Sequence, residues 1–316
     1  MKLVILDDWE YTFATNPLLN QLKGYFDITV YHDKPEQIEL IKRIQEADVI
    51  IPIRERTRFT KQVLQEMKKI KLIAQTGGGV AHIDMSEANR LRIPIATTAG
   101  GSRAVVELIF GFILAFSRKL VTLDRQVKSG EWPEILGTSL ENKTIGIIGL
   151  GNIGNGVATI AKAFGMRVIA WSPRLTQERT MAEGVEYKTL VELLQQAHYI
   201  SINLRLVPET RSLLRKEHFE LMRRDAFLIN TSRGEIIDEN ALCEALEQKK
   251  IAGAGLDVFT HEPIPSDHPL LHFENVILSP HIGWKTDLML QHFLEQAIEN
   301  IISNIVHQNP RNIINL

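Results

Sequence analysis

Three ionisable side chains stand just after short apolar segments in the last third of the sequence. Arg233 follows AFLINT, Glu262 follows AGAGLDV by a few residues, and His281 follows NVILSP. If these segments are parallel strands, the three side chains lie at the carboxyl edge of one sheet, where α/β proteins bind their ligands. Reduction of a carbonyl group by hydride needs a proton donor, and histidine, as a residue type, is a natural candidate for that role.

Glu262 and Arg233 suit supporting roles in such a reaction. Glu262, 19 residues before His281, can accept a hydrogen bond from the imidazole, orient the ring and favour its charged form. Arg233, in a Ser-Arg-Gly turn, can bind a substrate carboxylate through two parallel hydrogen bonds and polarise the adjacent carbonyl. Taken alone, each of the three residues is more often an ordinary surface charge, so the hypothesis depends on their occurring together.

A histidine-rich stretch offers a competing interpretation as a metal site. Residues 261–272 read HEPIPSDHPLLH. Three prolines interrupt the stretch, and only His268 and His272 have the i,i+4 spacing of two ligands on one helix face. We therefore expect a polar loop here and no metal ion.

A glycine-rich loop, GLGNIG at 149–154, follows the apolar segment 144–149 and precedes a helical pattern. Gly149, Gly151 and Gly154 form G-x-G-x-x-G, in which glycine allows a tight turn, a close approach of the backbone to a pyrophosphate, and close packing of helix on strand. The amides at the start of the helix then face the phosphates. The pattern alone also fits a structural glycine turn, but the strand before it and the helix after it favour a dinucleotide site.

The next predicted strand, RVIAW at 167–171, is followed by Ser172, Pro173 and Arg174. An acid usually stands at this point, accepts hydrogen bonds from the adenosine ribose and repels a 2′-phosphate. Ser172 removes that repulsion, and Arg174 brings a planar cation suited to a phosphate dianion. We therefore predict NADPH in preference to NADH. The alternative is that Arg174 points to solvent and Ser172 accommodates NADH.

The elements that must position these residues alternate in type along the whole chain. Apolar segments rich in Val and Ile alternate with longer segments of helical period, which predicts parallel strands joined by crossover helices. The first series of strands is expected at 2–6, 27–31, 48–52, 71–75 and 94–98. The second series is expected at 144–149, 167–171, 199–204, 226–231, 252–258 and 275–280. Two series predict two sheets and therefore two domains.

A long helix predicted over 102–120 joins the two series, and its apolar residues cover nearly the whole circumference, so we expect it to be buried. An irregular arm rich in Gly, Pro and Trp follows at 127–143. The amphipathic helix predicted over 284–308 can return to the first series. The prediction is an α/β protein with two Rossmann-like, doubly wound parallel-sheet domains, one formed by 1–100 plus 284–316 and the other, 101–283, inserted into it, with a cleft between the sheets.

Composition limits the functional classes. The 316 residues are 44% hydrophobic and 23% charged, with a formal net charge of −2. This profile is typical of a globular protein and gives no reason to expect a nucleic acid or an acidic membrane as partner. The single cysteine, Cys243, cannot form a disulfide within the chain. The apolar segment at the start, MKLVILDDWE, is too short for the apolar region of a signal peptide. A cytoplasmic location is therefore expected.

The motifs GLGNIG, NTSRGEIIDENAL, GAGLDVFTHEP and SPHIGW, in this order and spacing, resemble the D-isomer-specific 2-hydroxyacid dehydrogenase family. The resemblance extends over nearly the whole chain, through RVIAWSP and VPETRSLL, and is more specific in the second series of strands than in the first. It implies two Rossmann-like domains, the nucleotide domain being inserted into the substrate domain. It also implies a homodimer formed through the nucleotide domain, with the arm at 127–143 in the contact.

The resemblance implies catalytic roles for Arg233, Glu262 and His281, and contact of Asp257 with the nicotinamide amide. The family's loop for the substrate carboxylate corresponds to TGGGVAHID, and three consecutive glycines independently suit either an anion-binding nest or a plain turn. The expected cofactor-binding residues are Gly149, Gly151, Asn152, Ile153, Gly154, Ser172, Pro173, Arg174, Leu204, Arg205, Thr210, Thr231, Ser232, Arg233, Asp257, His281 and Gly283. The expected substrate-binding residues are Gly78, Gly79, Arg233 and His281, with Arg54 and Trp284 as pocket walls that suit a structural role equally well.

Some positions depart from the family pattern. Ala81 stands where an Asp is usual, His82 where an Asn is frequent, and Ser172 where an acid follows the strand. NLRLVP replaces the usual LHLPLT, which places Asn203 and Arg205 near the adenosine half of the cofactor. These departures leave the reaction type intact and affect the choice of substrate and cofactor.

The sequence thus predicts an NAD(P)-dependent oxidoreductase, acting on CH–OH donors, that interconverts a small 2-keto acid and its D-2-hydroxy acid. Arg233 and the amides of Gly78 and Gly79 would hold the carboxylate, His281 would protonate the oxygen, and closure of the two domains would exclude water. Glyoxylate and hydroxypyruvate are the leading substrates by analogy, because a preference for NADPH suits reduction.

Two alternatives remain open at this stage. The first is D-3-phosphoglycerate dehydrogenase activity. Its phosphorylated substrate needs extra basic groups, for which only Arg54, Arg56 and Arg58 stand out, and the 35 residues after His281 leave no room for a regulatory domain. The second alternative is a dinucleotide-sensing protein without turnover, as in the corepressor branch of the family.

Overall fold

The computed structural model describes residues 1–315 and divides the chain into two compact units. The first unit comprises residues 1–101 and the segment from Lys285 onward, and the second unit comprises Ser102–Trp284. The first unit is therefore built from both ends of the chain, with the second unit inserted between them. Within residues 1–315, no helix is both long and apolar enough to cross a membrane.

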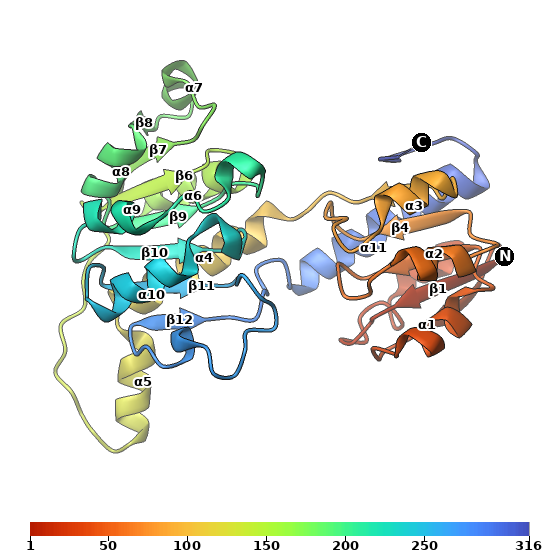
Figure 1. Ribbon diagram of the computed structural model, residues 1–316, viewed down its shortest axis with the longest axis horizontal. Coiled ribbons are helices and arrows are strands. Elements are labelled where there is room, and N and C mark those ends of the chain that lie inside the picture. The colour runs from red at the N-terminus through yellow and green to blue at the C-terminus, as the bar shows by residue number, and fades with distance from the viewer. Residues whose placement is uncertain (316) are drawn as a thin grey trace. The chain divides into compact units, whose positions relative to one another are not determined.

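The first unit contains a sheet of five parallel strands in the order β2-β1-β3-β4-β5 (Figure 1). The strands are β1 (Lys2–Leu6), β2 (Asp27–Val30), β3 (Val49–Pro52), β4 (Leu72–Gln75) and β5 (Ile95–Thr97). All residues of β3 and β4 are buried. Apart from Gln75 at the end of β4, their sequences are continuously apolar, as a strand covered on both faces requires, since alternation would place polar groups in the core.

Helices cover this first sheet. Helices α1 (Gln37–Ile44), α2 (Lys61–Glu66) and α3 (Met85–Arg90) neighbour one another and share one core with β1, β3 and β4. The turn η1 (Pro17–Leu22) packs against α11 (Asp287–Ile301), which also contacts β4 and β5 and continues as a π-helical segment, η5 (Ile302–Val306). The end of the chain returns to β5, where the amide of Ile95 donates to Asn315 Oδ1 at 2.8 Å.

The second unit contains seven parallel strands in the order β12-β11-β10-β9-β6-β7-β8. They are β6 (Thr144–Ile148), β7 (Arg167–Trp171), β8 (Glu186–Tyr187), β9 (Tyr199–Ile202), β10 (Phe227–Asn230), β11 (Gly253–Leu256) and β12 (Val276–Leu278). The chain runs outward from β6 to β8 on one side and from β9 to β12 on the other. The strand order therefore reverses between β6 and β9, which is where open α/β sheets bind ligands.

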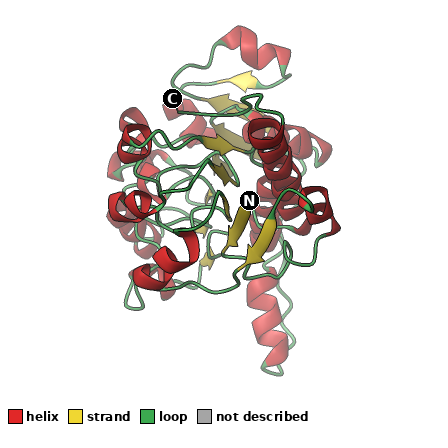
Figure 2. Cartoon of the chain, turned by 90° about the vertical axis from the view of Figure 1, so that its right-hand side faces the viewer, coloured by secondary structure: helices red, strands yellow, loops and turns green. Residues whose placement is uncertain are grey.

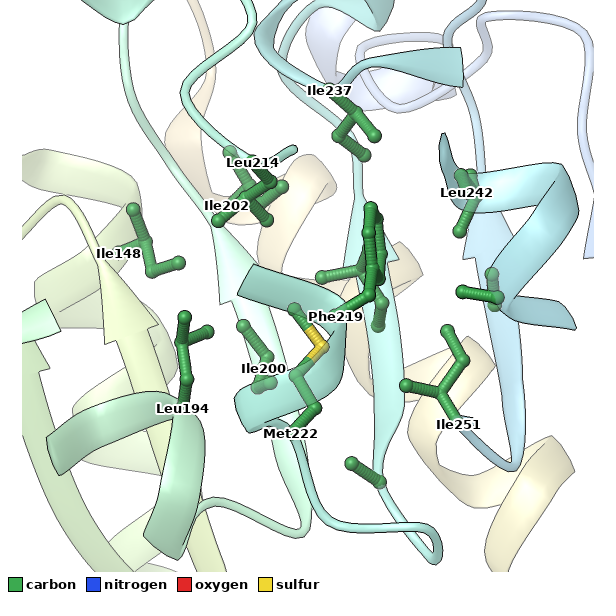
Figure 3. Packing of buried hydrophobic residues seen from close by; sticks show 14 of the residues in the cluster. Ile148, Leu194, Ile200, Ile202, Leu214, Phe219, Met222, Ile237, Leu242 and Ile251 are labelled. Atoms are coloured by element: carbon green, nitrogen blue, oxygen red, sulfur yellow. The ribbon is translucent and has the colours of Figure 1, made fainter. Parts of the chain in front are cut away.

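Two apolar cores hold helices against this second sheet, and Figure 2 distinguishes the helices and strands of the chain by colour. On one face lie α8 (Leu190–Gln196), α9 (Lys216–Leu221) and α10 (Glu239–Glu247). Figure 3 shows Leu194, Phe219 and Leu242 from these helices around Ile200 and Ile202 of β9. On the other face lie α4 (Ser102–Ser117) and α6 (Asn152–Ala163), while α7 (Gln177–Ala182) packs beside β8 at the sheet edge.

The fold class predicted from the sequence is confirmed, since both sheets are parallel and lie between helices. The prediction of one helix over 102–120 is corrected. Lys119 adopts a left-handed conformation with φ of 53°, so α4 ends at Ser117 and a separate α5 (Leu120–Lys128) follows. Helix α4 is not buried all round either, because Arg103, Glu107 and Gly111 form an exposed stripe at four-residue spacing.

Candidate active site

The three ionisable residues predicted from the sequence occupy turns after three adjacent strands. Arg233 follows β10, Glu262 lies in the loop after β11, and His281 follows β12. These strands are parallel neighbours, so the three turns share the carboxyl edge of the second unit's sheet. Nδ1 of His281 lies 2.7 Å from Oε2 of Glu262, which is typical of a charge-assisted hydrogen bond. The structure thus brings the acid and the histidine into direct contact.

Both carboxylate oxygens of Glu262 have partners. Oε1 accepts the amide of Phe259 at 3.0 Å, and Oε2 faces His281. Burial opposes ionisation of this carboxyl. The hydrogen bond and charge of His281, the Phe259 amide and the charge of Arg233 together outweigh burial and lower the pKa of Glu262. Glu262 is therefore ionised at neutral pH and directs Nδ1 of the imidazole toward itself, which leaves Nε2 for a ligand.

The turn that carries His281 is fixed by Asp257, whose side chain is buried at the end of β11. Asp257 Oδ1 accepts the Ser279 hydroxyl at 2.5 Å and the Ile282 amide at 2.8 Å, and Oδ2 accepts the Gly283 amide at 2.8 Å. Burial raises the pKa of Asp257 against the opposing effect of these donors. His281 has φ of 53°, a conformation that a non-glycine residue holds only where its surroundings enforce it.

The turn that carries Arg233 is held by Asn230, the buried last residue of β10. Asn230 Oδ1 accepts the Ser232 amide at 3.0 Å, and its Nδ2 donates to the Arg233 carbonyl at 2.9 Å. Gly234 is required next, because a Cβ there would lie 2.1 Å from the carbonyl carbon of Phe259. The turn can therefore approach the loop of Glu262. The Arg233 guanidinium is exposed. Among residues 1–315 it donates one hydrogen bond, from Nη1 to the carbonyl of Ser232.

The glycine loop has the geometry that a dinucleotide requires. Gly149 has φ of 104°, and a Cβ on it would lie 2.5 Å from the Asn203 carbonyl oxygen. A Cβ on Gly154 would lie 2.1 Å from the Gly149 carbonyl oxygen, so both positions exclude any side chain. A Cβ on Gly151 would meet nothing within 4 Å among the described residues. The first amides of α6, which begins at Asn152, have no side-chain cap. The loop thus presents unpartnered amides and open space, as a phosphate site does.

Residues 172–174 lie after β7, as expected, with Ser172 partly buried and Arg174 exposed. The Arg174 guanidinium makes no hydrogen bond or ion pair with the described part of the chain, so it is available to a ligand. A second arginine lies nearby that the sequence analysis did not identify. Arg179, in α7, donates through Nη2 to the carbonyl of Leu150 at 2.9 Å, which places its guanidinium against the glycine loop.

The loop after β9 is closed by Thr210. Its Oγ accepts the Val207 amide at 2.9 Å and lies 2.7 Å from the Arg205 carbonyl oxygen. Leu204 packs beside the first glycine of the phosphate loop, and the Arg205 side chain is exposed. The hydroxyl of Thr231, at the same sheet edge, is buried and has no partner among residues 1–315. A buried polar atom of this kind is normally satisfied by a ligand or by water, so the residues present fit a bound dinucleotide.

The first unit carries the predicted anion loop after β4. Gly77 has φ of 87° and donates its amide to the Thr98 hydroxyl at 2.6 Å. Gly78 is exposed, and a Cβ on it would meet no described atom within 4 Å. Arg54, after β3, lies over the loop, with Nη1 only 1.6 Å from the point that a Gly77 Cβ would occupy. The loop is therefore open at Gly78 and has a guanidinium beside it, as an anion site requires.

The three arginines that a phosphorylated substrate would need have different surroundings. Nη2 of Arg54 lies 3.5 Å from Oε2 of Glu55. Arg56 donates two hydrogen bonds to the Glu10 carboxylate, at 2.7 and 2.8 Å. Arg58 is exposed and forms no ion pair or hydrogen bond through its side chain within residues 1–315. Two of the three cations therefore already face a carboxylate.

The positions that depart from the family pattern lie at or near these sites. Ala81 is exposed, whereas His82 is half-buried with Nε2 3.2 Å from Gln75 Oε1. Burial lowers the pKa of His82 to about 4, so this imidazole is neutral at neutral pH. Trp284, the last residue of the second unit, is half-buried.

The histidine-rich stretch at 261–272 is largely an irregular loop with one short turn, η4 (Pro269–Leu271). His268 caps that turn by accepting the Leu270 amide at 3.2 Å, and its other ring nitrogen lies 3.2 Å from Glu239. Within residues 1–315 no group of three His, Cys, Asp or Glu side chains could hold a metal ion.

The parallel sheet, the glycine loop at its switch point and the Arg, Glu and His residues along its edge define a dinucleotide-dependent oxidoreductase. The family model for the NAD-binding domain of D-isomer specific 2-hydroxyacid dehydrogenases matches residues 110–283. The chain belongs to the D-isomer specific 2-hydroxyacid dehydrogenase family. It is an oxidoreductase that depends on a nicotinamide dinucleotide and acts on CH–OH donors, as the sequence predicted.

Similar proteins carry two activities in their names. A glyoxylate reductase of Aeropyrum pernix is 36% identical over 309 residues, which cover 94% of this chain and 92% of the relative. A D-3-phosphoglycerate dehydrogenase of Methanocaldococcus jannaschii is 40% identical over 253 residues, 79% of this chain but only 48% of the relative. The crystal structure of a putative D-3-phosphoglycerate dehydrogenase from Ralstonia solanacearum has a TM-score of 0.90 and 30% identity, covering 99% of this chain and 96% of that one.

Proposed function

We propose that this 2-hydroxyacid dehydrogenase reduces glyoxylate or hydroxypyruvate to the corresponding 2-hydroxy acid. The observation that carries the proposal is the contact of His281 with Glu262 on the same sheet edge as Arg233. This is the set of groups that proton transfer to a 2-keto acid needs. Relatives named glyoxylate reductase match nearly the whole length of the chain, which supports the small substrate.

In the proposed reaction the bound nicotinamide supplies a hydride to the keto carbon. Arg233 and the amides of Gly78 and Gly79 bind the carboxylate, and Arg233 also polarises the adjacent carbonyl. His281 carries a proton on Nε2 and donates it to the carbonyl oxygen as negative charge develops there. Glu262 keeps the ring oriented and stabilises the imidazolium.

We assign 101–283 as the NAD(P)-binding domain and 1–100 with 284–316 as the substrate domain, which agrees with the range that the family model matches. The residues proposed to hold the cofactor are those expected from the sequence, from the glycine loop to Gly283. Asp257 keeps lone pairs beyond those used in the His281 turn and is proposed to contact the nicotinamide amide. Arg54 and Trp284 are proposed as walls of the substrate pocket.

NADPH is the proposed cofactor, in preference to NADH. Ser172 leaves room for a 2′-phosphate, and the unpartnered guanidinium of Arg174 suits a dianion. Arg179 adds a second cation, and its bond to the Leu150 carbonyl orients the guanidinium before any ligand binds. A planar group that is already oriented loses less entropy on binding than a free side chain does.

D-3-phosphoglycerate dehydrogenase activity is the second candidate, because relatives with that name match the chain. Its substrate carries a phosphate as well as a carboxylate. The pairing of Arg54 with Glu55 and of Arg56 with Glu10 removes most of the surplus positive charge that would bind this phosphate. We therefore place this activity second.

A homodimer formed through the second unit is proposed. Figures 1 and 2 show that α5 projects from the body of this unit. No side chain of α5 is buried, and Trp132 and Leu136 in the arm that follows are 86% and 90% exposed. Apolar side chains this exposed are typical of an interface, and sedimentation will show the assembly state. We also propose a cytoplasmic location, in which the single Cys243 stays reduced.

The experiment that tests the function is a panel of small 2-keto acids, including a phosphorylated member, assayed with NADH and NADPH in parallel. We expect glyoxylate and hydroxypyruvate to give the highest kcat/KM, with NADPH as the better cofactor. Preference for the phosphorylated member would establish the second candidate instead. Absence of turnover with intact dinucleotide binding would indicate a sensor.

A further inference from the structure

Glu55 places a carboxylate directly against the anion loop of the first unit. Its Oε1 lies 1.8 Å from the point that a Cβ on Gly79 would occupy, so the carboxylate rests on the backbone of that glycine. Glu55 is part of the turn after β3, next to Arg54, whose guanidinium rests in the same way on Gly77. One cation and one anion therefore flank the exposed amide of Gly78.

The turn that carries the two charges is held by a network of hydrogen bonds. Arg54 has φ of 60°, and its amide donates to the Thr76 hydroxyl at 2.7 Å. Gln75 Nε2 donates to the Arg54 carbonyl at 3.1 Å, and the amide oxygen of Gln75 faces His82. The Arg54 guanidinium also lies 5.5 Å from the ring centre of Phe293. These contacts fix Arg54, and Glu55 is held against the loop by its ion pair with Arg54.

The charges around this loop are nearly balanced. Arg54 faces Glu55 at 3.5 Å. Glu10 accepts hydrogen bonds from Arg56 and forms an ion pair with Lys285 at 2.7 Å. A monoanionic carboxylate can use the Gly78 amide together with Arg54. A second anionic group brought to the same loop would meet the Glu55 carboxylate, while the guanidiniums of Arg54 and Arg56 already face carboxylates.

We propose that Glu55 determines substrate charge. It restricts the site to 2-keto acids with one carboxylate and a short side chain without negative charge, and it excludes substrates with a phosphate or a second carboxylate. The proposal rests on the proposed reduction of small 2-keto acids and adds the residue that selects among them. Repulsion of this kind is a common route to specificity, because it weakens the competitor more than the preferred ligand.

The test compares Glu55→Gln with the parent protein on hydroxypyruvate and on its 3-phosphorylated analogue. Gln keeps the size of Glu and removes its charge. We expect the ratio of kcat/KM for the phosphorylated substrate to that for hydroxypyruvate to rise about tenfold or more, through a lower KM for the phosphorylated compound. Glu55→Ser should change the ratio in the same direction. Glu36→Gln, which removes the charge of an exposed carboxylate elsewhere in the same unit, is the matched control for net charge.

A ratio in both Glu55 variants equal to that in Glu36→Gln, with folding verified by thermal melting, would overturn the proposal. So would a parent protein that uses the phosphorylated substrate as efficiently as hydroxypyruvate. Failure of the proposed function gives a different result, because the parent protein would then turn over none of these acids.

Discussion

Nδ1 of His281 lies 2.7 Å from Oε2 of Glu262, while His281 itself has φ of 53° in a turn held by Asp257. Two separate restraints therefore act on one imidazole. The backbone restraint from Asp257 sets where the ring lies, and the hydrogen bond to Glu262 sets which nitrogen is directed away from the acid. Proton donation from Nε2 requires both.

His281→Ala should lower kcat for 2-keto acid reduction by about 10²-fold or more, the usual contribution of a positioned proton donor. Binding of the dinucleotide should change little, because the phosphates are bound by the distant glycine loop. Steady-state assays of 2-keto acid reduction measure kcat, and calorimetric titration with the cofactor measures its affinity. Turnover near that of the parent protein would remove His281 from the mechanism.

Glu262→Gln should lower kcat and narrow the pH range of the reduction. The neutral amide still accepts a hydrogen bond from the ring but no longer favours the imidazolium, so the alkaline limb of the profile should move to lower pH. In the parent protein the pKa of Glu262 is lowered, so the stability that its ionised form contributes is present at neutral pH and is lost as pH falls through that pKa. A profile that keeps its alkaline limb in Glu262→Gln would contradict the pairing.

Arg233→Lys should raise KM for the 2-keto acid more than it changes KM for the cofactor. A lysine keeps the charge but cannot make the two parallel hydrogen bonds of a guanidinium to a carboxylate. Steady-state kinetics with glyoxylate at saturating cofactor measure the effect, and Arg211→Lys, an exposed arginine of the same unit, is the control. An unchanged KM for the acid would refute the carboxylate role.

The loops that carry chemistry were predictable because their information is local. Gly149, Gly151 and Gly154 lie between an apolar strand and a helical pattern, and Arg233, Glu262 and His281 each follow a short strand that the sequence predicts. Parallel strands then place their ends on one edge without further information. At these positions the residues that reveal the site in the sequence are the same residues that form it in the structure.

The residues that hold those loops were not predictable in the same way. Ser279 acts through its contact with Asp257, which forms only when β11 and β12 are aligned. Asn230 bonds within its own turn, and Asn at a strand end is a recognisable turn signal. Arg179 reaches back 29 residues to Leu150, a contact that no local pattern encodes. The break at Lys119 was missed because a helical pattern continues through it, and only the backbone conformation separates α4 from α5.

Arg174→Ala and Arg179→Ala should each weaken binding of 2′,5′-ADP more than binding of 5′-AMP. The two ligands differ by the 2′-phosphate, which is the group that the guanidiniums are proposed to bind. Calorimetric titration gives both affinities without any turnover, and the double variant should bind the two ligands about equally. Arg167→Ala, which breaks a surface pair between Arg167 of β7 and Glu186 of the neighbouring β8, is the control. Equal weakening of both ligands would count against the preference for NADPH.

Asp7→Asn should stabilise the protein at alkaline pH. The Asp7 side chain is 1% exposed, its Oδ1 has no described partner, and its φ is 66°. Burial is the main cause that raises the pKa of Asp7 from 3.8 to about 6. The folded state thus favours the protonated acid. The stability that the protonated Asp7 contributes is fully present below about pH 4. It is lost as pH rises through 6, because the folded protein then holds a buried carboxylate.

Asparagine resembles the protonated acid, keeps an acceptor for the Thr57 hydroxyl that now donates to Asp7 at 2.8 Å, and tolerates positive φ. We expect Asp7→Asn to raise the free energy of unfolding at pH 8 by about 1–3 kcal/mol, since each pKa unit corresponds to about 1.4 kcal/mol. At pH 4.5 the gain should be markedly smaller. Urea denaturation at both pH values measures the difference, with the exposed Asp27→Asn as control. A gain that is the same at both pH values would show that Asp7 is ionised in the folded protein throughout this range.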